Sequence, residues 1–481
     1  MTRGWFITGA LAASLAVPAA AAQEQFDRTK IPVPGQPPEL RVPTWTKDRL
    51  ANGAELIVSE RHDLPLVSFS ITFLGGANQY EPAGKRGTAS FTASLLSEGT
   101  KTRDAEAISL ALQLLGTSIG TAVGDESGSM SFVSTTASFE PVLEILADML
   151  VNPVFPEKGL ERLRAQRLVA LTQANAQPGS VNARVFSRVL YGDEHPYGQR
   201  ADESSIKAIS RDDVAAFHRT YFQPGRAIVT VVGDVKAGTV KATLDKAFAS
   251  WPAGGERPAF KYPPAPAPQK TTIYLVDMPG SAQSVFNMGH PGPSRDTPDF
   301  YALQVMNTML GGMFQSRLNA NIREEKGYSY GVRSGFAFGK GPGAFSAGGD
   351  IVTDKSDAAL QEFMKELRGI QGERPITNDE MDTAKNSLIQ RLPGQFGAVA
   401  QINSAITSLY VQGLPENYYQ NYGKNIAAVT REDVLRVAKQ HINLGQMAIV
   451  IVGDRAAIEE GLAKTGVAPI VHLDKEGRPV K

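Results

Sequence analysis

The sequence of 481 residues contains no cysteine. Disulfide bridges, thiolate zinc sites, iron–sulfur clusters and cysteine nucleophiles are therefore excluded. Histidine is also scarce, and no two histidines lie close enough in sequence to form a ligand pair on one helix or hairpin. The six are His62, His195, His218, His290, His441 and His472.

An excess of charge of either sign is also missing, because 49 lysine and arginine side chains balance 49 aspartate and glutamate side chains. Binding to a phosphate backbone needs a localised basic excess, and no run of lysine and arginine occurs, so we expect no nucleic-acid partner. The 42% hydrophobic and 20% charged residues are typical of a globular protein. The length suits two to four domains of about 100–200 residues each.

Long apolar runs are absent after the first 22 residues. There, Arg3 is followed by an apolar stretch from Trp5 to Val17 and then by three alanines, which is typical of a signal peptide with a small-x-small cleavage site. The alternative is an uncleaved membrane anchor, although Pro18 interrupts the stretch. We expect an exported protein, most simply a periplasmic one, with no membrane span after cleavage.

Two proline-rich stretches divide the remaining chain. Residues 23–43 form a lead-in, and residues 252–269 read as a linker between domains. They separate an N-terminal domain, residues 44–251, from a C-terminal domain of similar length, residues 270–470. Equal lengths raise the question of an internal repeat.

The two halves do repeat one another. Residues 210–234 align with residues 430–454 without a gap, and seven of the 25 positions are identical. Each segment predicts a helix with an N-cap, Ser210 or Thr430, followed by a turn and a buried strand that ends in Val-Gly-Asp. We infer that the chain arose by duplication.

The order of the other elements is also shared, with strands first and helices afterwards. Strands are predicted over residues 66–74, 127–137, 272–277, 283–289, 329–337 and 344–349, and helices over residues 87–96, 105–115 and 299–310 and within residues 139–190 and 354–438. This order predicts an α+β fold of two homologous domains, each a mostly antiparallel sheet with helices packed on one face.

Several segments together resemble a known family. Gly87-Thr88-Ala89 opens a helix, residues 195–198 read His-Pro-Tyr-Gly, and a strand ends at Val232-Gly233-Asp234. With the two repeated halves, these segments are similar to the insulinase or pitrilysin-type metallopeptidases, which include mitochondrial processing peptidase. The resemblance covers nearly all of the chain after the signal peptide.

The family's zinc motif has lost its chemistry in this chain. Members carry H-x-x-E-H on the helix after Gly-Thr-Ala, with two histidines that bind zinc and a glutamate that activates water. The matching positions are Ser90, Ala93 and Ser94. The helix that holds the third family ligand, residues 165–177 around Ala170, has no carboxylate. Hydroxyl and methyl groups do not replace these donors, so the resemblance implies no metal and no catalytic residue in this chain.

Two other kinds of catalytic site have partial support in the sequence. His195 lies beside Glu194, but a lone histidine of this kind is more often a packing or capping residue than a ligand. Ser90 and Ser94 raise the idea of a serine hydrolase, yet the chain has no G-x-S-x-G elbow. Neither pattern supports an independent active site.

The C-terminal half keeps a family segment on the substrate side, whereas the N-terminal half has lost the zinc motif. Residues 322–331 resemble the family segment R-E-x-x-G-x-x-Y, and the resemblance places Arg323 and Tyr330 as residues that reach a zinc site and contact substrate. Gly311 and Gly312 lie in a glycine-containing loop before this segment, where they would let a substrate backbone approach closely or let the loop move. A simple turn between helices is the alternative for this loop.

This asymmetry predicts a division of labour. We expect a non-zinc subunit of a heterodimeric zinc metallopeptidase, which lends its substrate-side residues to a homologous partner with an intact H-x-x-E-H motif and bound zinc. The expected substrate is a peptide. The alternative is a non-proteolytic structural or assembly subunit, like the respiratory-complex core proteins that share the fold.

Overall fold

The computed structural model describes residues 40–266 and 268–480. The predicted signal peptide and all but the last four residues of the lead-in lie outside this range. Residues 252–266 contain neither helix nor strand, and the domain boundaries on either side of them stay a prediction.

The N-terminal half builds a six-stranded sheet in the order β1-β2-β6-β3-β5-β4. Only the β2–β6 pair is parallel. Alternation of apolar and hydroxyl side chains along the two longest strands places one set of residues in the core and the other on the opposite face. The strands are β1 (Thr46–Arg49), β2 (Glu55–Glu60), β3 (Leu66–Leu74), β4 (Gly120–Val123), β5 (Ser127–Thr135) and β6 (Ala227–Gly233).

The C-terminal half builds a second six-stranded sheet in the order β12-β7-β11-β8-β10-β9. Five strands take the same places as their counterparts in the first sheet. The sixth differs, because β1 comes from the start of its half and pairs antiparallel, whereas β12 comes from the end and pairs parallel. The strands are β7 (Thr272–Asp277), β8 (Gln283–Pro291), β9 (Ser329–Phe336), β10 (Ala344–Val352), β11 (Ala448–Gly453) and β12 (Ile470–Leu473).

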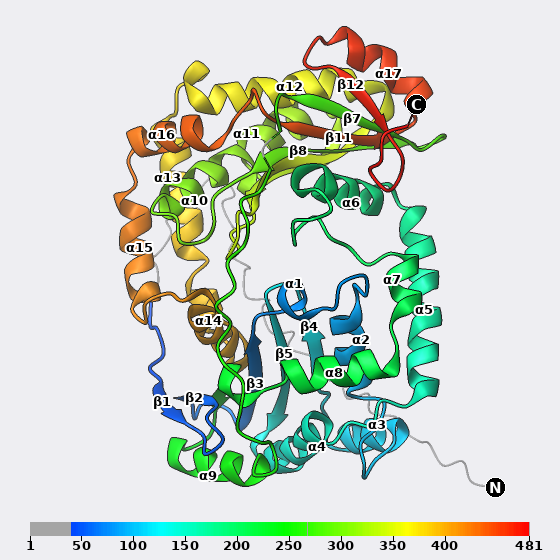
Figure 1. Cartoon of the computed structure of the whole chain (residues 1–481). Coiled ribbons are helices and arrows are strands. Elements are labelled where there is room, and N and C mark those ends of the chain that lie inside the picture. Colours follow the sequence, from blue (N-terminus) through cyan, green and yellow to red (C-terminus); the bar gives the residue numbers. More distant parts are fainter. Residues whose placement is uncertain (1–39, 267, 481) are drawn as a thin grey trace, which may run out of the picture. The chain divides into compact units, whose positions relative to one another are not determined.

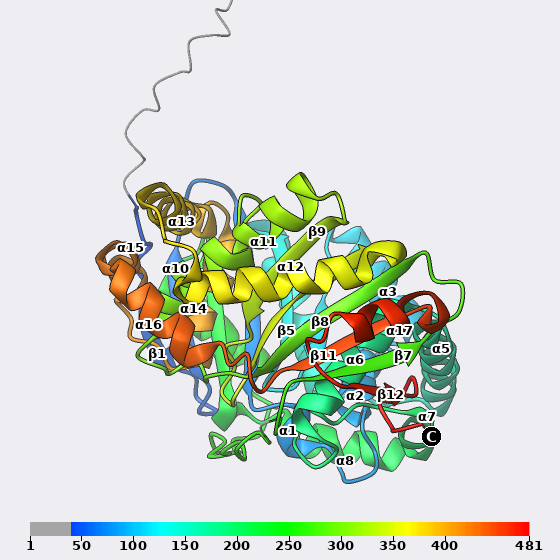
Figure 2. The same cartoon turned by 90° about the horizontal axis from the view of Figure 1, so that it is seen from above.

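Helices cover one face of each sheet and enclose its main apolar core. In Figure 2, α12 and α17 lie over the second sheet. Within the described residues, no helix has both the length and the apolar character needed to cross a bilayer. The helices are α1 (Ala77–Tyr80), α2 (Thr88–Leu95), α3 (Ala105–Leu114), α4 (Phe139–Val151), α5 (Glu157–Asn175), α6 (Pro178–Tyr191), α7 (Glu203–Ala208), α8 (Arg211–Tyr221), α9 (Ala237–Ala247), α10 (Phe300–Asn307), α11 (Arg317–Asn319), α12 (Ser356–Arg368), α13 (Asn378–Gln390), α14 (Val399–Gln412), α15 (Tyr418–Ala428), α16 (Arg431–His441) and α17 (Arg455–Lys464).

The predicted α+β class is confirmed, and the repeated segments fold alike. Helix α8 precedes β6 just as α16 precedes β11. Ser210 caps α8 in a capping box with Asp213, and Thr430 caps α16 in the same way with Asp433. Each box satisfies backbone N–H groups that the first helical turn leaves unpaired.

The two halves exchange one helix each, which the sequence did not reveal. Helix α6 belongs to the N-terminal half but packs on β8 and β11 of the second sheet. Helix α14 belongs to the C-terminal half but packs on β3 and β6 of the first sheet. Figure 1 shows both helices beside the sheet of the other half. Each sheet therefore has helices of its own half on one face and a single exchanged helix on the other.

A buried asparagine attaches each exchanged helix to its sheet. Asn182 of α6 donates from Nδ2 to the carbonyls of Val285 (2.8 Å) and Val450 (3.0 Å). Asn403 of α14 donates from Nδ2 to two carbonyls at the equivalent register positions of the first sheet, those of Ser68 (3.2 Å) and Thr230 (3.0 Å). The duplication therefore extends to this polar contact between halves.

Candidate functional site

The helix that carries the altered zinc motif begins beside an acidic side chain. Gly87 adopts φ 107° at the N-cap of α2, a conformation that favours glycine. The Glu81 carboxylate accepts the N–H groups of Gly87 (3.0 Å) and Ala89 (2.8 Å), and Arg86 forms a 3.0 Å ion pair with Glu81. A negative charge at a helix N-terminus complements the helix dipole. The residues before α2 therefore still define where this helix begins, although its zinc motif has changed.

The three altered motif positions lie on α2, where the residues present do not fit zinc. The Ser90 hydroxyl donates to the Gly87 carbonyl (2.9 Å), and Ala93 is buried. The guanidinium of Arg167, on α5, lies 3.5 Å from the Ser94 hydroxyl. A guanidinium at this place repels a divalent cation, and the hydroxyls beside it are poor zinc donors.

The helix expected to carry the third ligand is α5, which packs against α2. Ala170 lies on it with its side chain exposed. Across residues 40–266 and 268–480, no group of three histidine, aspartate or glutamate side chains is arranged to hold a metal ion. The prediction that this chain binds no metal still rests on the donor set at the motif positions.

Arg323 is held at the surface by two neighbours. It lies in a π-helical turn, Ala320–Glu325, that follows α11. Its guanidinium carbon is 4.6 Å from the centre of the Phe314 ring, and its Nε is 3.0 Å from Glu324 Oε1. A cation over an aromatic face contributes about 0.5–1 kcal/mol at an exposed site. The side chain is therefore oriented, yet 36% of it stays exposed.

Strand β9 contains a bulge at the position of Tyr330. Val332 pairs with Gly349 on β10, whereas Ser329 pairs with Ile351. Three residue steps on β9 therefore match two on β10, which defines a β-bulge. The bulge interrupts the alternation of side chains, so Ser329 and Val332 are both buried although they are three residues apart.

A hydroxyl group within the strand holds this bulge. Ser329 Oγ donates to the Asp350 carbonyl (2.6 Å) and accepts the N–H of Gly331 (3.0 Å). The extra residue is turned outward, and Tyr330 is 87% exposed. Its phenol is therefore accessible to another molecule.

The structure brings Arg323 and Tyr330 onto adjoining elements but does not bring them to the altered motif. The π-helical turn of Arg323 packs on β9, α11 and α12. Helix α2, which carries Ser90 and Ser94, packs on α5, α8 and β4. The two residues that the sequence predicts on the substrate side thus belong to a surface of the second half.

The two glycines before this segment have a packing role in the structure. The expected loop is instead a π-helical turn, Thr308–Gly312, that continues α10. A Cβ at buried Gly311 would lie 2.3 Å from the amide nitrogen of Ser334 on β9. At Gly312 it would lie 3.1 Å from Asn307 Nδ2. Close approach of this turn to β9 therefore requires Gly311, while contact of either glycine with a substrate stays a prediction.

His195 packs between neighbouring segments, as a lone histidine of this kind is expected to do. Its Nδ1 accepts the N–H of Tyr197 (3.1 Å), so its Nε2 carries the proton that the Pro263 carbonyl accepts (3.1 Å). The ring stacks on Tyr191 at a centroid distance of 5.0 Å. Burial lowers the pKa of His195, which keeps the imidazole neutral.

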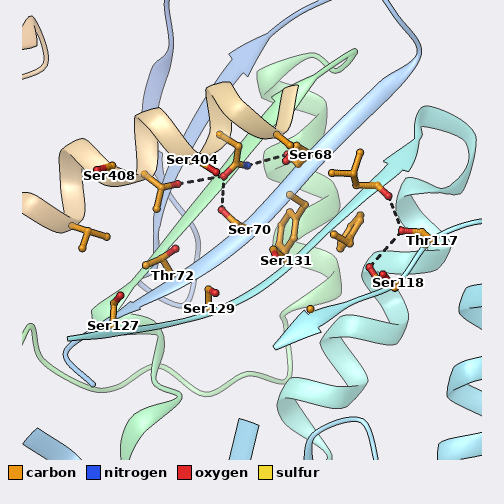
Figure 3. Close-up of a pocket in the computed structure, with 18 of the residues that line it drawn as sticks. Ser68, Ser70, Thr72, Thr117, Ser118, Ser127, Ser129, Ser131, Ser404 and Ser408 are labelled. Atoms are coloured by element: carbon orange, nitrogen blue, oxygen red, sulfur yellow. Dashed lines mark hydrogen bonds between the residues drawn. The ribbon is translucent and has the colours of Figure 1, made fainter. Parts of the chain in front are cut away.

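A cavity of about 1090 Å³ lies on the face of the first sheet that α14 partly covers. Figure 3 shows serine and threonine side chains from the strands, α14 and the α3–β4 connection around it. We refer to it as the hydroxyl cavity. Its hydroxyl-bearing residues are Ser68, Ser70, Thr72, Thr117, Ser118, Ser127, Ser129, Ser131, Ser404, Thr407 and Ser408.

Sequence reasoning missed this cavity. Its signal was present in β3 and β5, where apolar residues alternate with serine or threonine and no charge occurs on the second face. The alternation predicts strands, but it does not show that the hydroxyl face borders a cavity. That depends on α14, which comes from the other half of the chain.

Comparison with known proteins places the chain in a family. The sequence model described as insulinase (peptidase family M16) matches residues 57–193, and the model described as peptidase M16 inactive domain matches residues 208–388. The chain belongs to peptidase family M16. The predicted membership of the insulinase-type metallopeptidases is therefore confirmed.

Solved structures share the fold of this chain over most of its length. A peptidase M16 inactive domain from Pseudomonas fluorescens superimposes with a TM-score of 0.78 and 27% identity, covering 85% of this chain and 98% of that chain. A protease from Helicobacter pylori has the same fold, with a TM-score of 0.76 and 20% identity over 85% and 99% of the two chains.

Curated M16 relatives carry two kinds of name. A Helicobacter pylori protein named non-peptidase homolog YmxG is 25% identical over 83% of this chain and 92% of its own length. A Mycobacterium tuberculosis protein named uncharacterized zinc protease is 26% identical over 79% and 86% of the two chains. With its altered motif, this chain is an inactive member of the M16 family.

Proposed function

We propose that this chain is the non-zinc subunit of a heterodimeric, exported zinc metallopeptidase that hydrolyses peptides. One contrast supports the proposal. The zinc motif is replaced by hydroxyl and methyl groups beside Arg167, whereas Arg323 lies partly exposed against Phe314 and Tyr330 is exposed on the bulge of β9. A chain that had lost every function would have no reason to keep only the substrate-side residues.

The two exposed residues have the chemistry that a peptidase site needs. The Arg323 guanidinium is a permanently charged donor and suits the carbonyl of a bound peptide. The Tyr330 phenol is a neutral donor and suits the oxyanion that develops when water attacks that carbonyl. Removal of one such donor commonly costs about 2.7–4 kcal/mol of transition-state stabilisation. In this proposal both groups act at the H-x-x-E-H site of a homologous partner.

Two observations favour a second function. The name of the Helicobacter pylori relative describes a non-peptidase, and that protein spans 83% of this chain. Arg323 also has partners within its own chain, Glu324 and Phe314, as a surface charge cluster would. On this reading the chain is a structural or assembly subunit without a role in proteolysis.

Affinity purification of the tagged chain from its native host tests the proposal. We expect one co-purifying M16 protein with an intact H-x-x-E-H motif, and zinc at about one equivalent per pair. The isolated partner should cleave a quenched peptide slowly, and addition of this chain should raise the rate. Recovery without such a partner, or a partner whose rate does not change, would contradict the proposal and favour the assembly subunit.

A further inference from the structure

The hydroxyl cavity has a lining of one chemical kind. Of the side chains that border it in the described part of the chain, none is charged, and more than half carry a hydroxyl. Its volume of about 1090 Å³ slightly exceeds the range of about 300–1,000 Å³ that is usual for ligand sites. A sheet face exposed only to solvent would be expected to carry charged side chains at some positions along its length.

The hydroxyls form a regular array on neighbouring strands. Ser70 on β3 pairs with Ser131 on β5, and Thr72 pairs with Ser129. Side chains on one face of a strand repeat every two residues, at about 6.6–6.8 Å. The array therefore has the repeat of an extended polypeptide, whose successive groups on one side have the same spacing.

Several hydroxyls in the cavity make no protein hydrogen bond, although some of them are nearly buried. Ser70 donates to Asn403 Oδ1 (2.7 Å) and is thereby satisfied. Ser68 is 5% exposed and Thr72 is 6% exposed. Within residues 40–266 and 268–480 neither side chain makes a hydrogen bond, and the dashed line that reaches Ser68 in Figure 3 ends on its backbone carbonyl, which accepts from Asn403. In Figure 3 the Thr72 and Ser129 hydroxyls likewise carry no dashed line. None of these three oxygens is among the buried polar atoms that lack a partner, so they reach the solvent of the cavity and are available to a ligand there.

Hydroxyl groups also line the opposite wall of the cavity, which helix α14 forms. Ser404 and Ser408 are four residues apart on α14, so they lie on the same helical face. Both border the cavity and are exposed to it. A ligand between β5 and α14 would therefore meet hydroxyls on two sides.

We propose that the hydroxyl cavity binds an extended, uncharged polypeptide segment along β3 and β5. A hydroxyl both donates and accepts, so it can pair with the N–H and C=O groups of a peptide and with amide or hydroxyl side chains. A charged side chain would lose water here without gaining a counter-charge, which is unfavourable. The stretch from Ser127 to Val133 is about 20 Å long and accommodates about six extended residues.

This inference rests on the peptide-binding part of the proposed function and adds its substrate class. It does not need the partner subunit, because every residue named belongs to this chain. Failure to find a zinc-bearing partner would therefore leave it standing. Failure of peptide binding to this chain alone would overturn it without touching the partnership.

Isothermal titration calorimetry of the full chain with three blocked octapeptides tests the inference. The peptides consist of serine, threonine and asparagine, and they differ only in two central residues, which are serine, lysine or glutamate. We expect the neutral peptide to bind at least tenfold more tightly than either charged one. Equal affinities, or no binding of the neutral peptide, would overturn the inference.

A charge placed in the cavity gives the sharper readout. We expect Ser131→Lys to separate the two charged peptides, so that the glutamate peptide binds at least tenfold more tightly than the lysine peptide. Ser408→Lys, at an exposed helical position, should act in the same direction and guards against a folding defect in the strand variant. Thr46→Lys, on exposed β1 outside the cavity, is the matched control and should leave the order unchanged. Folded Ser131→Lys and Ser408→Lys proteins with unaltered selectivity would contradict the proposal.

Discussion

Two arginines of the same segment have opposite environments. Arg317 is 3% exposed, and its guanidinium binds Glu380 in a bidentate fashion, from Nε to Oε1 (2.6 Å) and from Nη2 to Oε2 (2.9 Å). Arg323 keeps 36% of its side chain exposed. Burial with a charged partner indicates a structural role, so Arg317 stabilises the fold whereas Arg323 is free to meet another molecule.

The Arg317–Glu380 pair predicts a pH-dependent stability. Burial would raise the pKa of Glu380, but hydrogen bonds from Arg317 and from the Thr377 amide outweigh it and lower the pKa to about 2. A folded-state pKa below the unfolded value of 4.5 stabilises the fold fully above about pH 4.5, and the contribution is lost as the pH falls toward 2. We expect Glu380→Gln to lower the free energy of unfolding by about 3 kcal/mol at pH 7.

Urea unfolding at pH 7 and pH 3 measures this effect. At pH 3 the difference between Glu380→Gln and the unchanged protein should shrink to less than half. Glu432→Gln, at an exposed position on α16, is the control and should change the free energy by less than about 0.5 kcal/mol at either pH. A loss in Glu380→Gln that is independent of pH would show that the charge is not what stabilises the pair.

At the residue scale, the sequence predicts only those site positions that lie within the family motifs. Ser90, Ala93, Ser94, Arg323 and Tyr330 could be named because they occupy recognisable segments, and their roles stay predictions. Nothing in the sequence placed Arg167 beside the motif, because that contact joins two helices more than 70 residues apart. The bulge that exposes Tyr330 also depends on pairing with β10 and leaves no local pattern.

At the scale of elements, the exchanged helices α6 and α14 are the feature that joins the two halves. Each has an apolar face against the sheet of the other half. Each also carries one buried asparagine that bonds to two strands at once. Apolar packing supplies most of the attraction, and the asparagine fixes the position of the helix along the strands.

The asparagine contact predicts a measurable stability loss. Asn403→Ala leaves the buried carbonyls of Ser68 and Thr230 without a side-chain donor, and we expect it to lower the free energy of unfolding by about 1–3 kcal/mol. Ser404→Ala, one residue further on α14, removes a hydroxyl that faces the cavity and should change stability by less than about 0.5 kcal/mol. Equal effects in thermal unfolding would show that the asparagine has no special part in holding α14.

Most of the longer elements could be predicted from the sequence, including the edge strand β9, whereas the four-residue edge strands could not. The predicted bounds of β3 and β7 agree with the structure, because period-two alternation or an apolar run marks each of them. Strands β1, β4 and β12 have four residues each and lie at or near sheet edges. Short edge strands bury little apolar surface, so no hydrophobic pattern in the sequence indicates them.

At the scale of the whole molecule, a glycine-rich hairpin tip of the second half contacts the first half. Glu126, in the β4–β5 turn, accepts the N–H of Lys340 at 3.1 Å and also the hydroxyl of Tyr197. Burial and the neighbouring Glu126 carboxylate raise the pKa of Tyr197, so the phenol stays protonated and donates. The phenol oxygen in turn accepts the N–H of Gly341 (2.9 Å).

Hydrogen exchange measures how much Glu126 contributes to this contact. We expect Glu126→Ala to speed amide exchange in residues 338–344 about tenfold, which corresponds to about 1.4 kcal/mol of lost protection. Glu256→Ala, an exposed acidic residue of the predicted linker, should leave the exchange unchanged. Identical exchange in the two variants would mean that other contacts hold the hairpin.

The relation between the halves was predictable only in part. Duplication was visible in the aligned segments, and equivalent strand orders followed from it. The exchange of α6 and α14 was not visible. The apolar face of an amphipathic helix indicates that the helix packs on another element, but it does not identify the sheet on which it packs. The hydroxyl cavity was missed for the same reason.

Peptide hydrolysis by the reconstituted pair tests the central claim most directly. The chain would be mixed with its zinc-bearing partner and a quenched peptide, as the unchanged protein and as Arg323→Ala, Tyr330→Phe and the control Lys326→Ala. We expect the first two variants to lower kcat about 10²-fold while still binding the partner, and the control to have no effect. A partner that works equally fast with Arg323→Ala and Tyr330→Phe, or equally fast alone, would contradict the claim.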